Sequence, residues 1–208
     1  MGLDSRVVSR TPPAFTSFTQ NADSPGLAAS DARVTGYALD RANVVRGSVP
    51  AGVEVGRRLW RLEASGRVPV PDAPFIGATT HVVYVDSATR GELGSISSGE
   101  SGPVAVLIPI RKTAAWWALA REERQAYVME GAPKGHLAIG RRYAARIYRR
   151  LYQARYVPGS EWDFLTYFEF PAHETGAFVD LLGELRDLDV NPEWAFVDRE
   201  VELWMTRL

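Results

Sequence analysis

The C-terminal half of the chain alternates strand-like and helix-like periodicity, and the order of these segments constrains the fold more than any other feature of the sequence. An apolar run over residues 104–110 has the length of a buried strand. Helical patterns follow over 115–129 and 135–147, strand patterns over 148–157 and 163–170, a helical pattern over 174–186 and a strand pattern over 194–205. Strand, helices, strand, strand, helix, strand is the order of a ferredoxin-like split β-α-β unit. We therefore predict an α+β fold with such a unit over residues 103–208.

Individual residues refine the expected ends of these segments. Thr113 is a candidate cap for the helix over 115–129. Pro109 predicts that the run over 104–110 ends there or lies at a sheet edge, because proline cannot donate a ladder hydrogen bond. Apolar residues spaced i, i+3, i+4 and i+7 predict an amphipathic helix over 174–186, namely Phe178, Leu181, Leu182 and Leu185.

The N-terminal half carries weaker signals. Residues 1–30 are polar and rich in Ser, Thr, Pro and Ala, which predicts a flexible or irregular arm. Residues 31–102 hold short strand-like runs, such as 58–62 and 81–85, punctuated by Gly and Pro. Within them, the Gly- and Ser-rich stretch over 86–102 predicts a loop. The N-terminal half has about the same size as the C-terminal half and carries a weaker version of its pattern, so we expect a degenerate ferredoxin-like half over residues 31–102 and two such halves per subunit.

Composition excludes several kinds of site. The 208 residues include no cysteine, so disulfides, thiolate zinc sites, iron–sulfur clusters and cysteine nucleophiles are ruled out. The net charge of −1 gives no general attraction to nucleic acid or acidic membranes. The first residues lack the apolar core of a signal peptide, and no stretch approaches the roughly 20 apolar residues of a membrane span. We expect a cytoplasmic protein that binds neither nucleic acid nor membranes.

Three histidines are the first candidates for chemistry. His173 precedes a predicted helix, where a capping or solvent-exposed role is the simpler interpretation, and His81 begins a strand-like run as a surface or core residue. His136 shares a helical stripe with apolar and small residues at i+3, i+4, i+7 and i+11, namely Ile139, Gly140, Tyr143 and Ile147. Its pattern alone favours a buried core histidine, and a ligand role stays open.

Other candidates also have a simpler structural interpretation. Trp116 and Trp117 follow Lys112, and adjacent tryptophans on a helix are most simply core residues. Glu193 is either exposed or accepts a hydrogen bond from an imidazole. Arginines and tyrosines interleave over 141–156, which could bind single-stranded nucleic acid. A solvated face explains them better, because they span a helix and a strand. No P-loop, dinucleotide fingerprint or HExxH motif is present.

Several blocks occur together in an order that resembles the chlorite dismutase family. They are IPIRKTAAWWALAREERQAYV (108–128), GHLAIG (135–140), RRLYQAR (149–155), WDFLTYFEF (162–170) and PEWAFVDREVELW (192–204). The resemblance covers the chain from about residue 104 onward and is closest to the short, leaderless, dimeric lineage. It implies a dimeric α/β-barrel type of ferredoxin-like fold and a homodimer.

The resemblance also implies a haem b site. His136 matches the proximal iron ligand, and Arg149, thirteen residues later, matches the distal arginine. Glu193 matches the carboxylate that accepts a hydrogen bond from the ligand imidazole, and Lys112 belongs to the same network. The tryptophan pair at 116–117 matches residues beside the haem and its propionates.

The activity implied is decomposition of the small anion chlorite to chloride and dioxygen, through a ferryl haem and transient hypochlorite. Three alternatives stay open: a coproporphyrin-type haem decarboxylase, a non-catalytic haem carrier or sensor, and a cofactor-free ferredoxin-like interaction module. Arg149 favours the chlorite-active branch over the decarboxylase. The chain departs from the family at Gln153, where a histidine is frequent, and in a longer interval between Trp117 and His136. Its N-terminal half also departs from the family, apart from the segment GATT (77–80).

Overall fold

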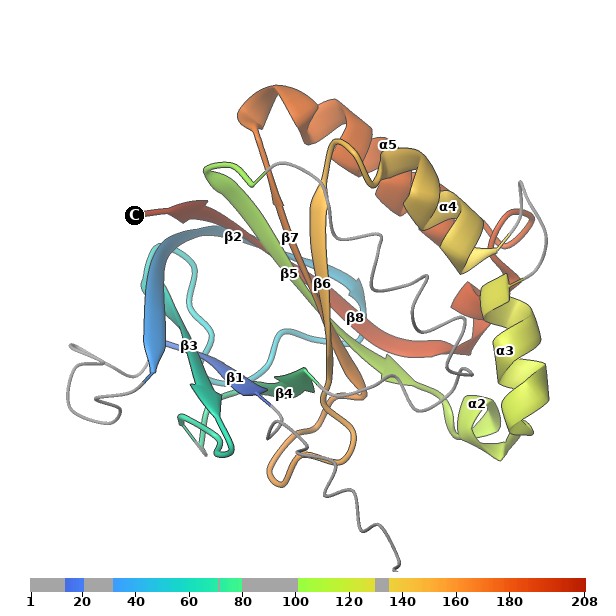
Figure 1. The fold of residues 1–208 in the computed structure, drawn as a ribbon, viewed down its shortest axis with the longest axis horizontal. Helices are drawn as coiled ribbons and strands as arrows, with labels where there is room; N and C mark the ends of the chain where they lie inside the picture. Colours follow the sequence, from blue (N-terminus) through green and yellow to red (C-terminus); the bar gives the residue numbers. More distant parts are fainter. Residues whose placement is uncertain (1–13, 21–31, 71, 80–100, 130–134) are drawn as a thin grey trace, which may run out of the picture.

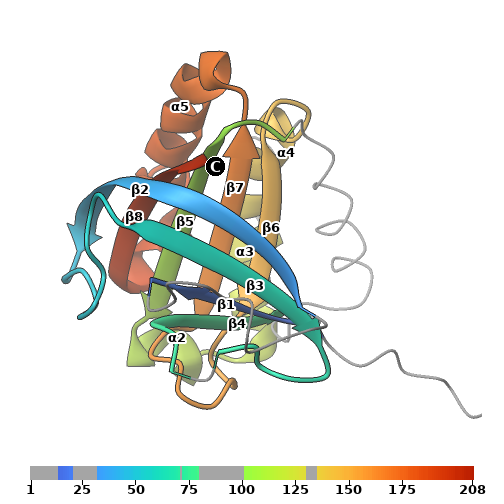
Figure 2. The same cartoon turned by 90° about the vertical axis from the view of Figure 1, so that its left-hand side faces the viewer.

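The computed structural model describes residues 14–20, 32–70, 72–79, 101–129 and 135–208. Eight strands form the frame of this described part (Figure 1). They are β1 (Ala14–Thr19), β2 (Arg33–Arg46), β3 (Arg58–Ser65), β4 (Phe75–Thr79), β5 (Val104–Lys112), β6 (Tyr148–Gln153), β7 (Phe164–Phe170) and β8 (Val197–Arg207). Every pairing is antiparallel, in the order β1-β3-β2-β8-β5-β7-β6-β4. Strand β4 also pairs with β1 and, at Ala78 and Gln153, with β6, so the sheet curls into a barrel (Figure 2).

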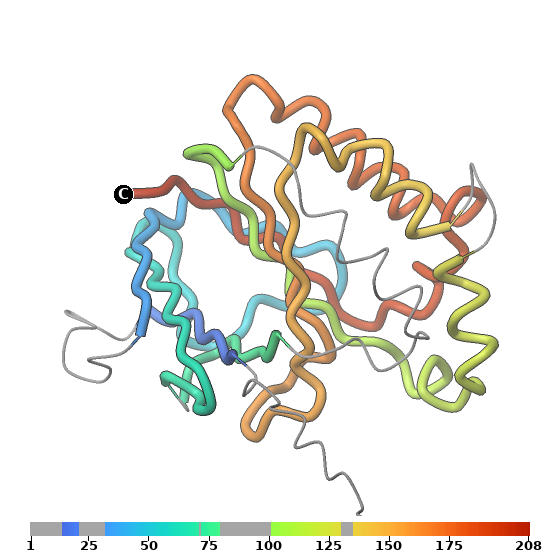
Figure 3. The backbone as a smooth tube through the Cα atoms, in the orientation of Figure 1, coloured from blue at the N-terminus to red at the C-terminus, as the bar shows by residue number. Residues whose placement is uncertain are grey.

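The strand order explains the ferredoxin-like pattern. The C-terminal half contributes four strands, β5 to β8 in chain order. Their spatial order is β8-β5-β7-β6, so the last of the four lies beside the first, and the third lies between the first and the second. The N-terminal strands have the same order, β4-β1-β3-β2. The two sets join where β2 runs beside β8, a contact between distant parts of the sequence that Figure 3 shows clearly. The α+β class is confirmed, and the division into two ferredoxin-like halves stays a prediction.

Helices cover one outer face of the sheet. They are α2 (Ala114–Ala118), α3 (Arg121–Met129), α4 (His136–Tyr143) and α5 (Thr175–Arg186), with short 3-10 turns η2 (Ala172–Glu174) and η3 (Pro192–Phe196). Helices α4 and α5 lie against each other outside β5, β6 and β7, and α2 and α3 follow the end of β5 (Figure 1). Among the described residues, no helix is long and apolar enough to cross a membrane.

Alternation along the strands builds a core on each face of the sheet. On β7, Leu165 and Tyr167 point into the barrel and join its interior cluster, whereas Phe168 and Phe170 point toward α5. Phe178 of α5 packs on both of these phenylalanines, with ring centroids 5.0 and 4.6 Å away. The predicted amphipathic helix is thus confirmed. Its packing on β7 forms a layer of side chains between the sheet and the helices.

Two expectations for individual strands were wrong. The arm expected over residues 1–30 contains β1, whose buried residues pair with both β3 and β4; residues 1–13 and 21–30 lie outside the described residues. Strand β5 continues through Pro109 between two neighbours. Its pairing with β8 breaks after Leu107 and resumes at Ile110, so the missing N–H of Pro109 falls in the interruption. The predicted loop over 86–102 and strand over 81–85 lie almost wholly outside the described residues.

Two expected segments have different bounds in the structure. The helix expected over 115–129 breaks into α2 and α3 because Leu119 is extended, and the Glu123 carboxylate accepts a hydrogen bond from the Ala120 N–H at 2.6 Å. The strand expected over 194–205 begins three residues later, since Pro192 opens the turn η3.

The predicted cap at Thr113 is confirmed and gives a stability test. Its hydroxyl accepts a hydrogen bond from the Trp116 N–H at 3.3 Å. We expect Thr113→Ala to lower the free energy of unfolding by about 1 kcal/mol, because that N–H then loses its partner at the helix start. Urea unfolding followed by circular dichroism measures the change. An unaltered midpoint would mean that the cap contributes nothing to stability.

Candidate functional site

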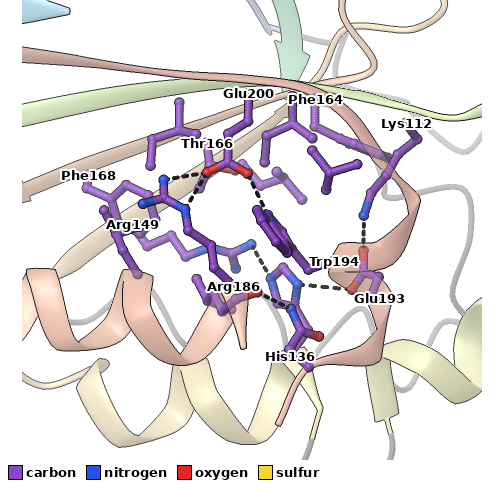
Figure 4. A pocket seen from close by; sticks show the side chains of 17 residues that line it. Lys112, His136, Arg149, Phe164, Thr166, Phe168, Arg186, Glu193, Trp194 and Glu200 are labelled. Carbon is purple, nitrogen blue, oxygen red and sulfur yellow. Dashed lines mark hydrogen bonds and ion pairs between the residues drawn. The ribbon is translucent and has the colours of Figure 1, made fainter. Parts of the chain in front are cut away.

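A pocket lies between the outer face of the sheet and helices α4 and α5 (Figure 4). Its walls are largely apolar, with residues from β5, β6, β7 and α5: Ile108, Ile110, Leu151, Phe164, Phe168, Leu182 and Leu185. Its polar lining includes Lys112, His136, Arg149, Thr166, Arg186, Asn191, Glu193 and Glu200. The space enclosed between these side chains is about 70 Å³. Apolar walls with a few convergent polar groups are typical of a ligand site.

His136 is the first residue of α4, at the rim of this pocket. Gly135 before it has φ 96°, a conformation that glycine adopts without strain, and its N–H donates to the Val190 carbonyl at 3.1 Å. The imidazole is anchored on one side, since Nδ1 lies 3.1 Å from Oε2 of Glu193. The other nitrogen, Nε2, faces the pocket (Figure 4).

Glu193 links the histidine to Lys112. The Lys112 ammonium donates to Oε1 of Glu193 at 2.8 Å, and both side chains are 6% exposed. Burial would raise the pKa of Glu193, but Lys112 and His136 outweigh it and lower that pKa below its usual range. Glu193 is therefore a buried carboxylate held ionised, which fixes the ring of His136 and increases its electron density.

Arg149 reaches the same pocket from strand β6. Alternation along β6 turns Arg149 toward the helices and its neighbour Arg150 toward the barrel interior. Its Nη2 lies 3.4 Å from Nε2 of His136, so the guanidinium faces the nitrogen that Glu193 leaves accessible. The structure thus brings together four of the six predicted site residues.

The two tryptophans lie one layer behind the pocket. Trp116 is fully buried, and the Lys112 ammonium lies 4.8 Å from its ring centroid. Trp117 stacks on the pocket residue Phe164 at 6.0 Å and donates from Nε1 to Asp163 at 3.2 Å. Among the described residues, neither tryptophan lines the pocket, so each contacts it through Lys112 or Phe164.

Sequence reasoning missed a second charged group in the pocket. Arg186, at the end of α5, donates to Glu200 from Nε at 2.8 Å and forms an ion pair with Glu202 at 2.6 Å. Burial would lower the pKa of Arg186, but these two carboxylates raise it. The Trp194 indole donates to Glu200 at 3.2 Å. The available signal was the alternation of Glu200, Glu202 and Trp204 on one face of a strand.

The fold and the site together define a class: an α+β barrel protein in which a buried lysine–glutamate pair holds a half-buried histidine, whose imidazole faces a largely apolar pocket opposite an arginine. The family model described as "Chlorite dismutase" matches residues 48–202. The chain belongs to the chlorite dismutase family.

Individual relatives agree with this membership. The chlorite dismutase of Ideonella dechloratans is 26% identical over 122 residues, which is 56% of this chain and 40% of that protein's length. The dimeric chlorite dismutase of Nitrobacter winogradskyi is 28% identical, with 93% of this chain and 99% of the other aligned and a TM-score of 0.66. A mutant chlorite dismutase of Candidatus Nitrospira defluvii shares the fold, with a TM-score of 0.61. It is 22% identical, and the alignment covers 94% of this chain and 90% of the other.

Proteins of this family bind haem, and the donor set here fits that group. One neutral imidazole nitrogen, backed by a buried carboxylate, is the ligand that a five-coordinate haem iron takes. Apolar walls suit the macrocycle, and the cations suit its carboxylates. Because Arg149 contacts Nε2 itself, haem binding at this nitrogen requires that the flexible Arg149 side chain leave that contact.

Proposed function

We propose that the protein is a haem b enzyme that decomposes chlorite, ClO2⁻, to Cl⁻ and O2. The observation that carries the proposal is the placement of Arg149, whose guanidinium faces Nε2 of His136 from the opposite wall of the pocket. A permanent cation beside the ligand-binding nitrogen suits a small anionic substrate. The family to which the chain belongs supports this reaction class.

His136 would hold the haem through Nε2, while its Nδ1–H donates to Glu193. When bound, the haem supplies an iron that can accept an oxygen atom from chlorite and return it. Lys112 keeps Glu193 ionised, so the imidazole stays electron-rich and fixed in one orientation. These residues perform no bond-breaking step themselves; they set the position and basicity of the ligand.

Arg149 would act on the substrate, from the pocket wall opposite His136. Its guanidinium cannot lose its proton at working pH and offers several donors in a plane. It can therefore bind the oxygens of chlorite and retain a negatively charged chlorine oxide in the pocket until both oxygen atoms have left as O2. The apolar side chains of Leu151 and Phe168 beside it offer few groups that an oxidant would attack.

We extend the proposal to a homodimer. It rests on the dimeric description of the Nitrobacter winogradskyi protein, which aligns over almost its whole length.

The test is oxygen release on an electrode after chlorite is added to the haem-loaded protein. We expect one O2 and one Cl⁻ per chlorite consumed. A normal ferric haem spectrum without oxygen release would overturn the proposal. Conversion of iron coproporphyrin under the same conditions would then identify a decarboxylase. Haem that is bound and exchanged without turnover of either substrate would identify a carrier or sensor, and no haem binding would point to an interaction module.

A further inference from the structure

A second charged cluster lines the interior of the barrel at one end, on the opposite side of the sheet from the His136 pocket. Its charged residues occupy inward-facing positions of β2, β3, β6, β7 and β8 around a hollow of about 390 Å³: Arg33, Arg61, Glu63, Arg150, Glu169 and Arg207. Apolar and aromatic side chains fill much of the rest of the barrel interior. The interior of an eight-stranded barrel is wide enough either to be filled by side chains or to hold one small ligand.

Arg61 forms the floor of this hollow and is 7% exposed. It donates to the Tyr152 hydroxyl at 2.8 Å and to Glu63 at 2.9 Å, and lies 3.9 Å from Glu169. Its Nε is buried and has no hydrogen-bond partner among the described residues. A buried guanidinium in the lining of a hollow supplies a fixed positive charge there, which a bound anion would offset.

The arginines exceed the carboxylates that could neutralise them. Both glutamates are already engaged, because Glu63 also pairs with Arg150 at 3.4 Å and Glu169 accepts from the Tyr167 hydroxyl. Arg33 and Arg207 are exposed and form no ion pair with any other described residue. Four guanidinium groups around one hollow repel each other, and a bound anion would remove that repulsion.

We infer that this end of the barrel binds a small oxyanion with at least two negative charges, of the phosphate or di- and tricarboxylate class. Arg33 and Arg207 attract it at the rim, and Arg61 and Arg150 bind its oxygens. The site is distinct from the His136 pocket, because Arg149 and Arg150 point to opposite faces of β6. The inference stands independently of the proposed function.

The test is calorimetric titration of the haem-loaded full chain with citrate and, separately, inorganic phosphate at low ionic strength. We expect saturable binding of at least one of them, much weaker binding of acetate, and no change in the Soret band. The double variant Arg33→Gln with Arg207→Gln should bind at least about tenfold more weakly, since charge-assisted hydrogen bonds are lost. These two side chains are exposed, so the variant should fold normally.

Arg58→Gln is the matched control. Arg58 is exposed on β3 but pairs with Ala38 on the outer face of the barrel, away from the hollow. It should bind as tightly as the unaltered chain. An absence of saturable binding, or equal weakening in the control, would overturn the inference. Binding that shifts the Soret band and survives the double substitution would place the anion at the haem instead, with the same consequence.

Discussion

Haem binding should weaken by more than about 100-fold in His136→Ala, because the loss of residues that merely support a metal ligand already costs about 10- to 100-fold. Among the described pocket residues, the imidazole is the one side chain whose nitrogen has a lone pair available to bind iron. Titration of the haem-free protein with haem, followed at the Soret band, measures the affinity. Added imidazole should partly restore a histidine-ligated spectrum, since the substitution leaves space beside Glu193.

His173→Ala controls for loss of an imidazole elsewhere. His173 lies in η2 with its side chain 76% exposed, and its nearest ion-pair partner is Glu174 at 3.7 Å. We expect its haem affinity to equal that of the unaltered chain. An unchanged haem spectrum in His136→Ala would contradict the ligand assignment, provided that circular dichroism shows both variants folded.

The C-terminal half could be predicted because its signals are local. The aromatic run of β7 and the apolar stripe of α5 are each determined by neighbours within one segment, and both agree with the structure to within a residue. Local patterns could not predict the barrel, because it depends on pairings between distant residues, and only the resemblance implied a barrel type of fold. Nothing in the sequence of β2 indicates that Tyr37 will lie opposite Arg207. Strand β1 was missed because six residues between polar segments give little periodicity.

The site, like the fold, could be predicted only in part from the sequence. Pattern alone favoured a core residue at His136, and only the resemblance connected it with Glu193, 57 positions away. The structure adds two facts that neither the pattern nor the resemblance contained. Glu193 lies in the turn η3. The buried ion pair that it forms with Lys112 requires β5 and η3 to meet. Arg186 and Glu200 were missed because a charged residue at the end of a helix or within a strand is usually solvated.

Turnover of chlorite should fall by about 10²- to 10³-fold in Arg149→Ala, the usual cost of removing one fixed donor that stabilises charge in a reaction. Haem affinity should change far less, because Arg149 contacts His136 but is not needed to hold Glu193 or Lys112. Oxygen electrode rates and Soret titrations on the same samples separate the two effects. Hypochlorite, trapped with a chlorinatable dye, should increase, since the cation that retains it is gone.

Two further variants test whether charge or shape matters. Arg149→Lys keeps the positive charge but loses the planar fork, so its turnover should lie between those of the alanine variant and the unaltered chain. Arg146→Ala removes a nearby arginine whose side chain is 52% exposed and paired with Glu174, an exposed contact that contributes little. It should retain full turnover. Undiminished oxygen release by Arg149→Ala, with no added hypochlorite, would exclude Arg149 from the reaction, and the proposed function would then lose the observation on which it depends.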